Sequence, residues 1–138
     1  MAMKTYHGSC HCGAVRYTAA FDLSKGTARC NCTICTKMRI WHAVLSEHDF
    51  ALLSDPGRLS DYTWVAPGQS APRLHLFSCR RCSVAIFSSG DFGRGKFYAI
   101  NVMSLDDLDP DELAAAPVKY EDGRHDRWDR VPEDIRLL

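Results

Sequence analysis

The sequence predicts a mainly β fold with few short helices, in which metal ions hold antiparallel sheets together. Two observations support this prediction: turn signals recur about every ten residues, and the seven cysteines fall into three short clusters. Short runs between regularly spaced turns are typical of antiparallel strands. Seven is an odd number, so at least one cysteine has no partner within the chain, and clustered cysteines in a reducing compartment indicate metal ligands or catalytic thiols rather than disulfides.

Several runs between the turn signals alternate in hydrophobicity with a period of two, which predicts strands. They lie at 14–21, 59–65, 73–78, 84–88 and 97–102. Helical signals are weak. We expect a turn or two at 33–39 and one short helix at 110–116, with Asp109 as its N-cap and Pro110 at the first helical position.

Length and charge describe an ordinary globular protein. The 138 residues fit one domain, spanning 1–138, and the 17 basic residues balance the 17 acidic ones. This balance argues against a nucleic-acid partner, which favours a basic face. No apolar run has the length of a membrane span, and the start lacks the apolar region of a secretory signal, so we expect a cytoplasmic protein with no membrane partner.

The first and third cysteine clusters predict a closed structural zinc site. Cys10 and Cys12 are two residues apart, so on a strand both sulfurs would project from one face toward one ion, whereas a disulfide between them would be strained. Cys79 and Cys82 form a C-x-x-C turn between two predicted strands, a common half of a tetrahedral zinc site. The alternative for this pair is a redox C-x-x-C, which usually opens a helix in a βαβ unit.

The second cluster places Cys30, Cys32 and Cys35 within six residues. Three protein ligands with an open fourth position are typical of a catalytic zinc site. Three alternatives stay open: a histidine such as His42 or His11 completes the site, Cys32 and Cys35 form a redox pair, or the cysteines are buried as small apolar side chains.

The three clusters in their sequence context resemble the glutathione-dependent formaldehyde-activating enzyme family, whose domain is shared with centromere protein V. The resemblance rests on residues 8–15 (GSCHCGAV), 30–37 (CNCTICTK), 77–83 (FSCRRCS) and the element LDDL at 105–108, and it covers a core at about 5–108, leaving a C-terminal arm at 109–138. It implies several curled sheets in a β-tent arrangement and two zinc ions per chain. Cys10, Cys12, Cys79 and Cys82 match the family's structural site, and Cys30, Cys32 and Cys35 its catalytic site.

The resemblance also implies an activity: a carbon–sulfur lyase that reversibly joins glutathione to formaldehyde, as an S-(hydroxymethyl)glutathione synthase does. Its partners would be a small thiol such as glutathione and an aldehyde. Two departures bear on the substrate. Serine stands at position 83, where the family usually has glycine, and the bulky residues 38–41 follow the second cluster, where they would narrow the pocket.

The residues that would recognise the substrate and move its proton are less defined. The carboxylates of glutathione favour cationic partners, for which Lys37, Arg39, Arg58 and Arg73 are candidates. His42 is the nearest candidate acid or base in sequence, although an ordinary polar contact is an equally simple role.

Other functional classes remain open. One alternative is a zinc-stabilised binding or scaffold module without catalysis, as the likeness to centromere protein V suggests, and another is a redox or metal-storage protein. The complete three-cysteine cluster favours the enzyme, because a scaffold needs only the closed site. We also expect Trp128, in the charged stretch 120–138, either to pack on the domain or to lie in a loosely held tail.

Overall fold

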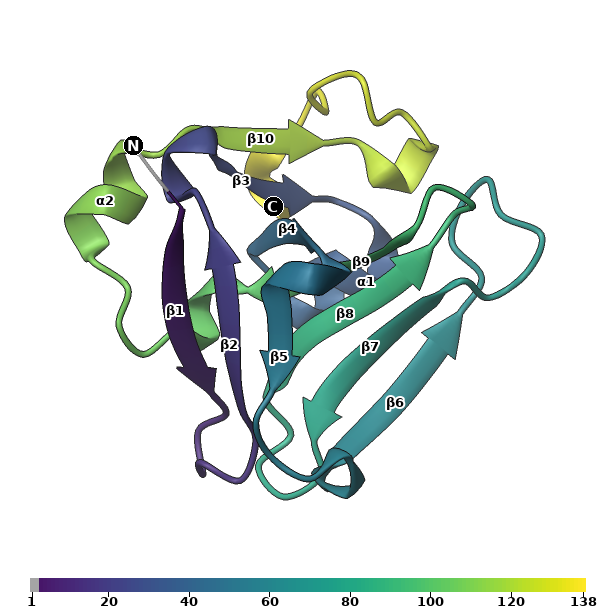
Figure 1. Ribbon diagram of the computed structural model, residues 1–138. Helices are drawn as coiled ribbons and strands as arrows, with labels where there is room; N and C mark the ends of the chain where they lie inside the picture. The colour runs from purple at the N-terminus through teal and green to yellow at the C-terminus, as the bar shows by residue number, and fades with distance from the viewer. Residues whose placement is uncertain (1–2) are drawn as a thin grey trace.

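Two β-sheets pack against each other and enclose the core (Figure 1). The computed structural model describes residues 3–138, which form ten strands, two α-helices and six short 3-10 turns. The smaller sheet has the order β1-β2-β5, with β1 at Lys4–Ser9, β2 at Arg16–Phe21 and β5 at Phe50–Leu52. The larger sheet has the order β10-β3-β4-β9-β8-β7-β6. Its strands are β3 (Thr27–Cys30), β4 (His42–Ser46), β6 (Leu59–Trp64), β7 (Leu74–Cys79), β8 (Ala85–Asp91), β9 (Lys96–Asn101) and β10 (Val118–Glu121).

The mainly β prediction is confirmed, and each of the five predicted strands matches an observed one. The two helices are short: α1 covers Thr33–Met38 and α2 covers Pro110–Ala115. The predicted cap of α2 is confirmed, because the Asp109 side chain accepts a hydrogen bond from the backbone N–H of Asp111 at 2.9 Å. Neither helix in residues 3–138 is long and apolar enough to cross a membrane.

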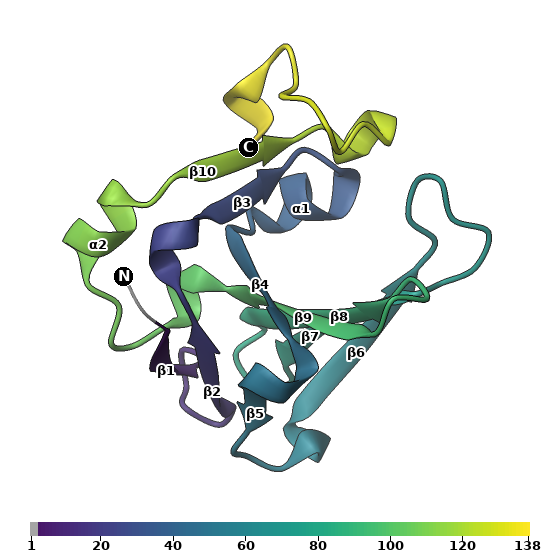
Figure 2. The same cartoon turned by 45° about the horizontal axis from the view of Figure 1, so that its top comes forward.

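Strand β10 departs from the antiparallel pattern. It pairs in parallel with β3, with Glu121 opposite Cys30, while the other strand pairs between residues 3 and 138 are antiparallel. This pairing places the start of the C-terminal stretch inside the larger sheet. The two views show β10 and β3 side by side, with α1 close to the end of β3 (Figures 1 and 2).

The core lies where the inner faces of the two sheets meet. The largest fully buried side chains include Tyr17, Ile86 and Ile100, one from the smaller sheet and two from the larger. Phe50 of the smaller sheet stacks on Tyr98 of the larger sheet, with ring centroids 4.2 Å apart. Aromatic packing of this kind adds to the burial energy of both sheets and fixes their relative position.

Candidate metal centres

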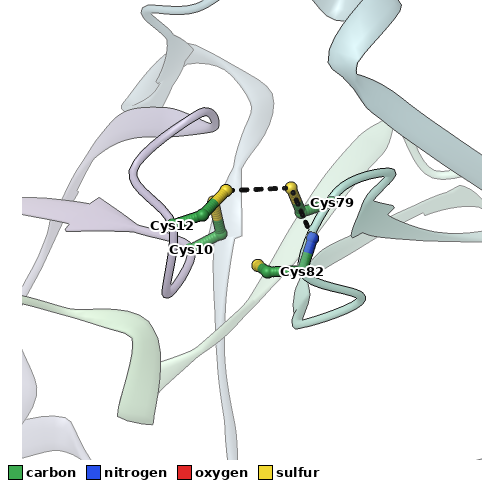
Figure 3. A group of neighbouring side chains, drawn as sticks. All are labelled: Cys10, Cys12, Cys79 and Cys82. Atoms are coloured by element: carbon green, nitrogen blue, oxygen red, sulfur yellow. Dashed lines mark hydrogen bonds between the residues drawn. The ribbon is translucent and has the colours of Figure 1, made fainter.

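Four cysteines from distant parts of the chain converge on one point (Figure 3). The sulfurs of Cys10, Cys12, Cys79 and Cys82 all lie within 4.8 Å of one another. The Cys10–Cys12 and Cys12–Cys79 sulfur pairs are 3.6 and 3.7 Å apart. Those distances are far too long for disulfides. They match the edge of about 3.8 Å that a tetrahedron of sulfurs has around zinc, given a zinc–sulfur bond of about 2.3 Å. The geometry and the soft thiolate donors therefore fit a tetrahedral zinc ion.

Two tight turns carry these four cysteines. Cys10 and Cys12 lie in a turn after β1 rather than on a strand, which corrects the strand geometry expected from their spacing. Gly13, at φ 79°, closes this turn in a conformation that favours glycine. Ser83 closes the other turn at φ 68°, where an L-residue with a side chain is strained. This strain gives a physical reason for the glycine that the family resemblance leads us to expect at this position.

Backbone amides point at the sulfurs of the four-cysteine site. The Val15 N–H donates to Cys10 Sγ at 3.3 Å, and the Arg81 N–H donates to Cys79 Sγ at 3.3 Å. Hydrogen bonds from the backbone N–H groups of Val84 and Cys12 lower the pKa of Cys82 to about 6. Such donors stabilise the thiolate form, which is the form that binds metal.

The second cluster also converges. The sulfurs of Cys30, Cys32 and Cys35 all lie within 4.8 Å of one another. Cys30 ends β3, Cys32 is the N-cap of α1 and Cys35 lies in the first turn of α1. Among residues 3–138, no histidine or carboxylate joins the three sulfurs within that distance. The chain thus presents three thiols, and the set fits a zinc ion that keeps one position for a further ligand.

The three thiols influence each other strongly. Hydrogen bonds from the Cys30 and Cys35 thiols lower the pKa of Cys32 to about 3. The same hydrogen bonds raise the pKa of the two partner thiols. The hydrogen bond with Cys32 raises the pKa of Cys30 to about 11. Hydrogen bonds with Cys30 and Cys32 raise the pKa of Cys35. Three thiolates this close repel one another, so a divalent cation is what would allow all three to ionise together.

A buried polar network ties the three-cysteine loop to the C-terminal segment. Asn31, 3% exposed, donates from its side chain to Asp122 Oδ1 at 2.9 Å and accepts from the Arg124 N–H at 3.0 Å. The Arg124 guanidinium donates to the Asn31 carbonyl at 2.9 Å and to Thr36 Oγ1 at 3.2 Å. Hydrogen bonds from Asn31 and His125 lower the pKa of Asp122. The loop between the cysteines is therefore held by residues about 90 positions away in sequence.

The three thiols lie at a pocket of about 650 Å³, a size typical of small-molecule sites. Cys30, Cys32 and Cys35 all line it, together with His42 and Glu121. His42 Nε2 is 3.7 Å from Glu121 Oε1, and the two side chains are 13% and 15% exposed. An acid–base pair therefore lies in the same pocket as the three sulfurs. The pocket lining includes residues of α1, β8 and β9, and Figure 2 shows where these elements lie in the fold.

Gly123 shapes the edge of this pocket. A β-carbon on Gly123 would collide with the Cys30 sulfur and would approach the Trp128 ring to 2.6 Å. Only glycine therefore allows the turn after β10 to pass so close to the cluster. Trp128 packs against this turn, lines the pocket and keeps 43% of its surface exposed. Of the two expectations for the tail, the structure has the one in which Trp128 contacts the domain.

The sequence-based predictions for residues around the second cluster have mixed outcomes. His42 lies in the pocket, whereas His11 is exposed on the turn between Cys10 and Cys12. Of the bulky residues 38–41, only Ile40 lines the pocket; the Trp41 indole instead donates to Thr27 Oγ1 at 2.7 Å. The candidate cations Lys37, Arg39, Arg58 and Arg73 do not line the pocket in the part of the chain that the structure describes.

Some residues of the site were not found from the sequence. Glu121, Asp122 and Arg124 were assigned to a C-terminal arm, and Asn31 was noted only as part of a motif. The dipeptide Asp122–Gly123 is a typical turn signal, but nothing in the sequence links it to the cysteines. A parallel strand pairing across the whole domain creates this link.

The fold and the two clusters define a class: a β protein with one closed four-cysteine site and one three-cysteine site open to a pocket. Comparison with known proteins supports this class. The family described as glutathione-dependent formaldehyde-activating enzyme matches residues 5–121, and the chain belongs to this family. A solved structure of a Rhodobacter sphaeroides protein has the same fold, with a TM-score of 0.65 at 22% identity, covering 82% of this chain and 99% of that chain. The family assignment predicted from the cysteine motifs is confirmed.

Proposed function

We propose that the protein is a zinc-dependent enzyme of the carbon–sulfur lyase type, which joins a small thiol to an aldehyde and cleaves the adduct. The observation that carries this proposal is the meeting of three cysteine thiols and an acid–base pair in one pocket. The family description, which names glutathione and formaldehyde, supports this reaction class. Cys10, Cys12, Cys79 and Cys82 would hold a structural zinc ion, and Cys30, Cys32 and Cys35 a catalytic one, giving two per chain. The free cysteines fit a cytoplasmic setting.

A zinc ion held by the three cysteines would lower the pKa of a substrate thiol or polarise an aldehyde oxygen. The other tasks fall to the side chains of this chain. In the forward direction the S–C bond forms, the C=O double bond becomes a single bond, and the thiol proton ends on the oxygen. His42 and Glu121 are the groups in the pocket that are placed to carry that proton.

Metal analysis combined with cobalt substitution tests the proposal. The purified protein is expected to contain two zinc ions, and the Cys32→Ser variant one. Cobalt in place of the second zinc should change its absorption when a small thiol is added, because thiolate ligation alters the cobalt spectrum. The Cys32→Ser protein should lose both this response and the formation of the thiol–aldehyde adduct. A spectrum that stays unchanged with several saturating thiols would favour the scaffold alternative.

A further inference from the structure

The walls of the pocket above the three cysteines are largely apolar. Strand β4 contributes Val44, strands β8 and β9 contribute Phe87 and Phe97, and helix α1 contributes Ile34. The segment after β6 adds Trp64 and Val65. A volume of about 650 Å³ lined in this way can bury a ring-sized apolar group.

The charges in the pocket do not match glutathione. No lysine or arginine lines the pocket within residues 3–138, and its one carboxylate is Glu121. Two nearby cations are already engaged: Arg124 with Asn31 and Thr36, and Lys119 with Glu121 at 3.6 Å. Glutathione carries two carboxylates and one ammonium group, so a net negative charge would enter an apolar site beside Glu121 without a lysine or arginine from the lining. A charge buried without a partner is strongly unfavourable.

Several pocket residues are also more exposed than apolar side chains usually are. Val44, Val65, Phe92 and Trp128 are 59%, 54%, 44% and 43% exposed, and all four line this pocket. Apolar surface gathered around a cavity, rather than scattered singly, marks a binding surface. Trp128 is held in place, because its indole N–H donates to Asp126 Oδ1 at 2.8 Å.

The loop between β6 and β7 lies close to the C-terminal segment at Asp126. A β-carbon on Gly68, in the loop between β6 and β7, would lie 2.8 Å from the carboxylate carbon of Asp126. The loop that follows Trp64 and Val65 therefore touches the segment that carries Trp128. Both segments supply apolar residues to the pocket lining, Trp64 and Val65 from one and Trp128 from the other.

We infer that this pocket selects a neutral thiol with an aromatic or branched aliphatic group, and its hemithioacetal with a small aldehyde, over the glutathione adduct. This inference rests on the proposed function, because the three cysteines and their metal define where the substrate sulfur lies. The reaction is unchanged: the S–C bond forms or breaks, and the proton moves between sulfur and oxygen. What changes is the group attached to sulfur, which lies along the apolar walls instead of meeting a cationic site.

Calorimetric titration of the zinc-loaded protein tests the inference. 2-Phenylethanethiol, glutathione and 2-mercaptoethanol share a thiol but differ in charge and apolar area. Burial of the phenyl ring should make 2-phenylethanethiol bind at least about tenfold more tightly than either of the others. Quenching of tryptophan fluorescence should accompany its binding, because Trp64 and Trp128 line the pocket. Glutathione binding equal to or tighter than that of 2-phenylethanethiol would overturn the inference.

Two lysine variants, one on the pocket wall and one outside it, test whether the pocket lining determines the preference between the two thiols. Val44→Lys places a cation on the pocket wall and should improve glutathione binding about threefold to fivefold while weakening 2-phenylethanethiol. Leu53→Lys adds the same charge at a side chain that is 57% exposed and lies outside the pocket lining, and should leave the affinity ratio unchanged. Equal effects of the two variants would contradict the inference.

The cobalt spectrum separates this inference from the proposed function. A spectrum that responds to both thiols, with glutathione bound more tightly, refutes the apolar preference alone. A spectrum that responds to neither thiol, with 2-phenylethanethiol still preferred by calorimetry, refutes the thiol chemistry and leaves an apolar binding pocket.

Discussion

Replacing Cys82 with serine removes one of the four sulfurs that join the turn after β1 to the turn after β7. Cys12 and Cys79, from the two halves of this site, are 67 positions apart in sequence. A cross-link that closes a loop of this length removes about 4 kcal/mol of chain entropy from the unfolded state. For a domain of this size that corresponds to roughly 15 °C in the melting temperature. Loss of the zinc–sulfur bonds themselves adds to this effect.

The three-cysteine site supplies the matched comparison. Cys30 and Cys35 are only five positions apart, so their metal closes a short loop. From the ratio of the two loop lengths, the four-cysteine site restrains about 2 kcal/mol more chain entropy than the three-cysteine site. The Cys32→Ser protein also keeps the hydrogen bonds of Asn31 that hold the loop. We therefore expect it to lose one zinc ion but only roughly 5 °C in melting temperature.

Zinc analysis and thermal melts of the two variants, measured side by side, test whether the four-cysteine site stabilises the fold more than the three-cysteine site. Cys82→Ser should lose zinc and melt far below the parent protein, and Cys32→Ser should lose zinc and melt close to it. A Cys82→Ser protein that retains two zinc ions and the parent melting temperature would refute the structural site. Equal melting losses in both variants would refute the argument from loop length.

Three further predictions follow from particular residues. Ser83→Gly should raise the melting temperature by roughly 3 °C, because it relieves about 1 kcal/mol of strain at φ 68°; an unchanged melt would show that the turn is not strained. Acidification should release zinc from the three-cysteine site first, because only three thiolates would hold that ion against four at the closed site; protons compete for the sulfurs with a raised pKa, which are Cys30 and Cys35 at one site and Cys12 at the other. Chelator-monitored release should therefore show two steps, and Cys32→Ser should remove the one at higher pH. Truncation after Gly123 should lower the melting temperature by roughly 6 °C, since it deletes the Arg124 side chain with its hydrogen bonds to a buried loop; an unchanged melt would mean that the tail contributes nothing.

The sequence was informative where local pattern decides structure. Period-two alternation located strands such as β2, in which Tyr17, Ala19 and Phe21 are buried and the residues between them are not. It missed β1, β3, β4, β5 and β10. Of these, β3 and β10 have four residues each and β5 has three, too few to show a period. Asp109 and Pro110 specified the start of α2 correctly, because a cap depends on neighbouring residues alone.

At the two cysteine sites, too, the sequence predicts what neighbouring residues determine and misses what depends on distant parts of the chain. The cysteines could be found because their spacing within each cluster is short and because metal coordination constrains that spacing. The strand geometry considered for Cys10 and Cys12 is not the one observed, because the pair lies in a turn that Gly13 closes, and this turn brings the sulfurs together equally well. Glu121 could not be found, because its position opposite Cys30 depends on a parallel pairing between strands about ninety residues apart.

The parallel pairing of β10 with β3 gives the three-cysteine site surroundings that come from distant parts of the chain. Its ligands are local, but its surroundings are not: His42 comes from β4, which flanks β3 on one side, and Glu121 from β10, which flanks it on the other. Asn31, between two of the ligands, bonds to Asp122 directly after β10. We therefore expect a metal ion at the three cysteines to leave or exchange without loss of the loop that would bind it. A shift of β10 would move Glu121 relative to His42, together with the segment that carries Trp128. If the proposed function holds, we expect a substitution in the C-terminal segment to alter the choice of substrate although all seven cysteines remain in place.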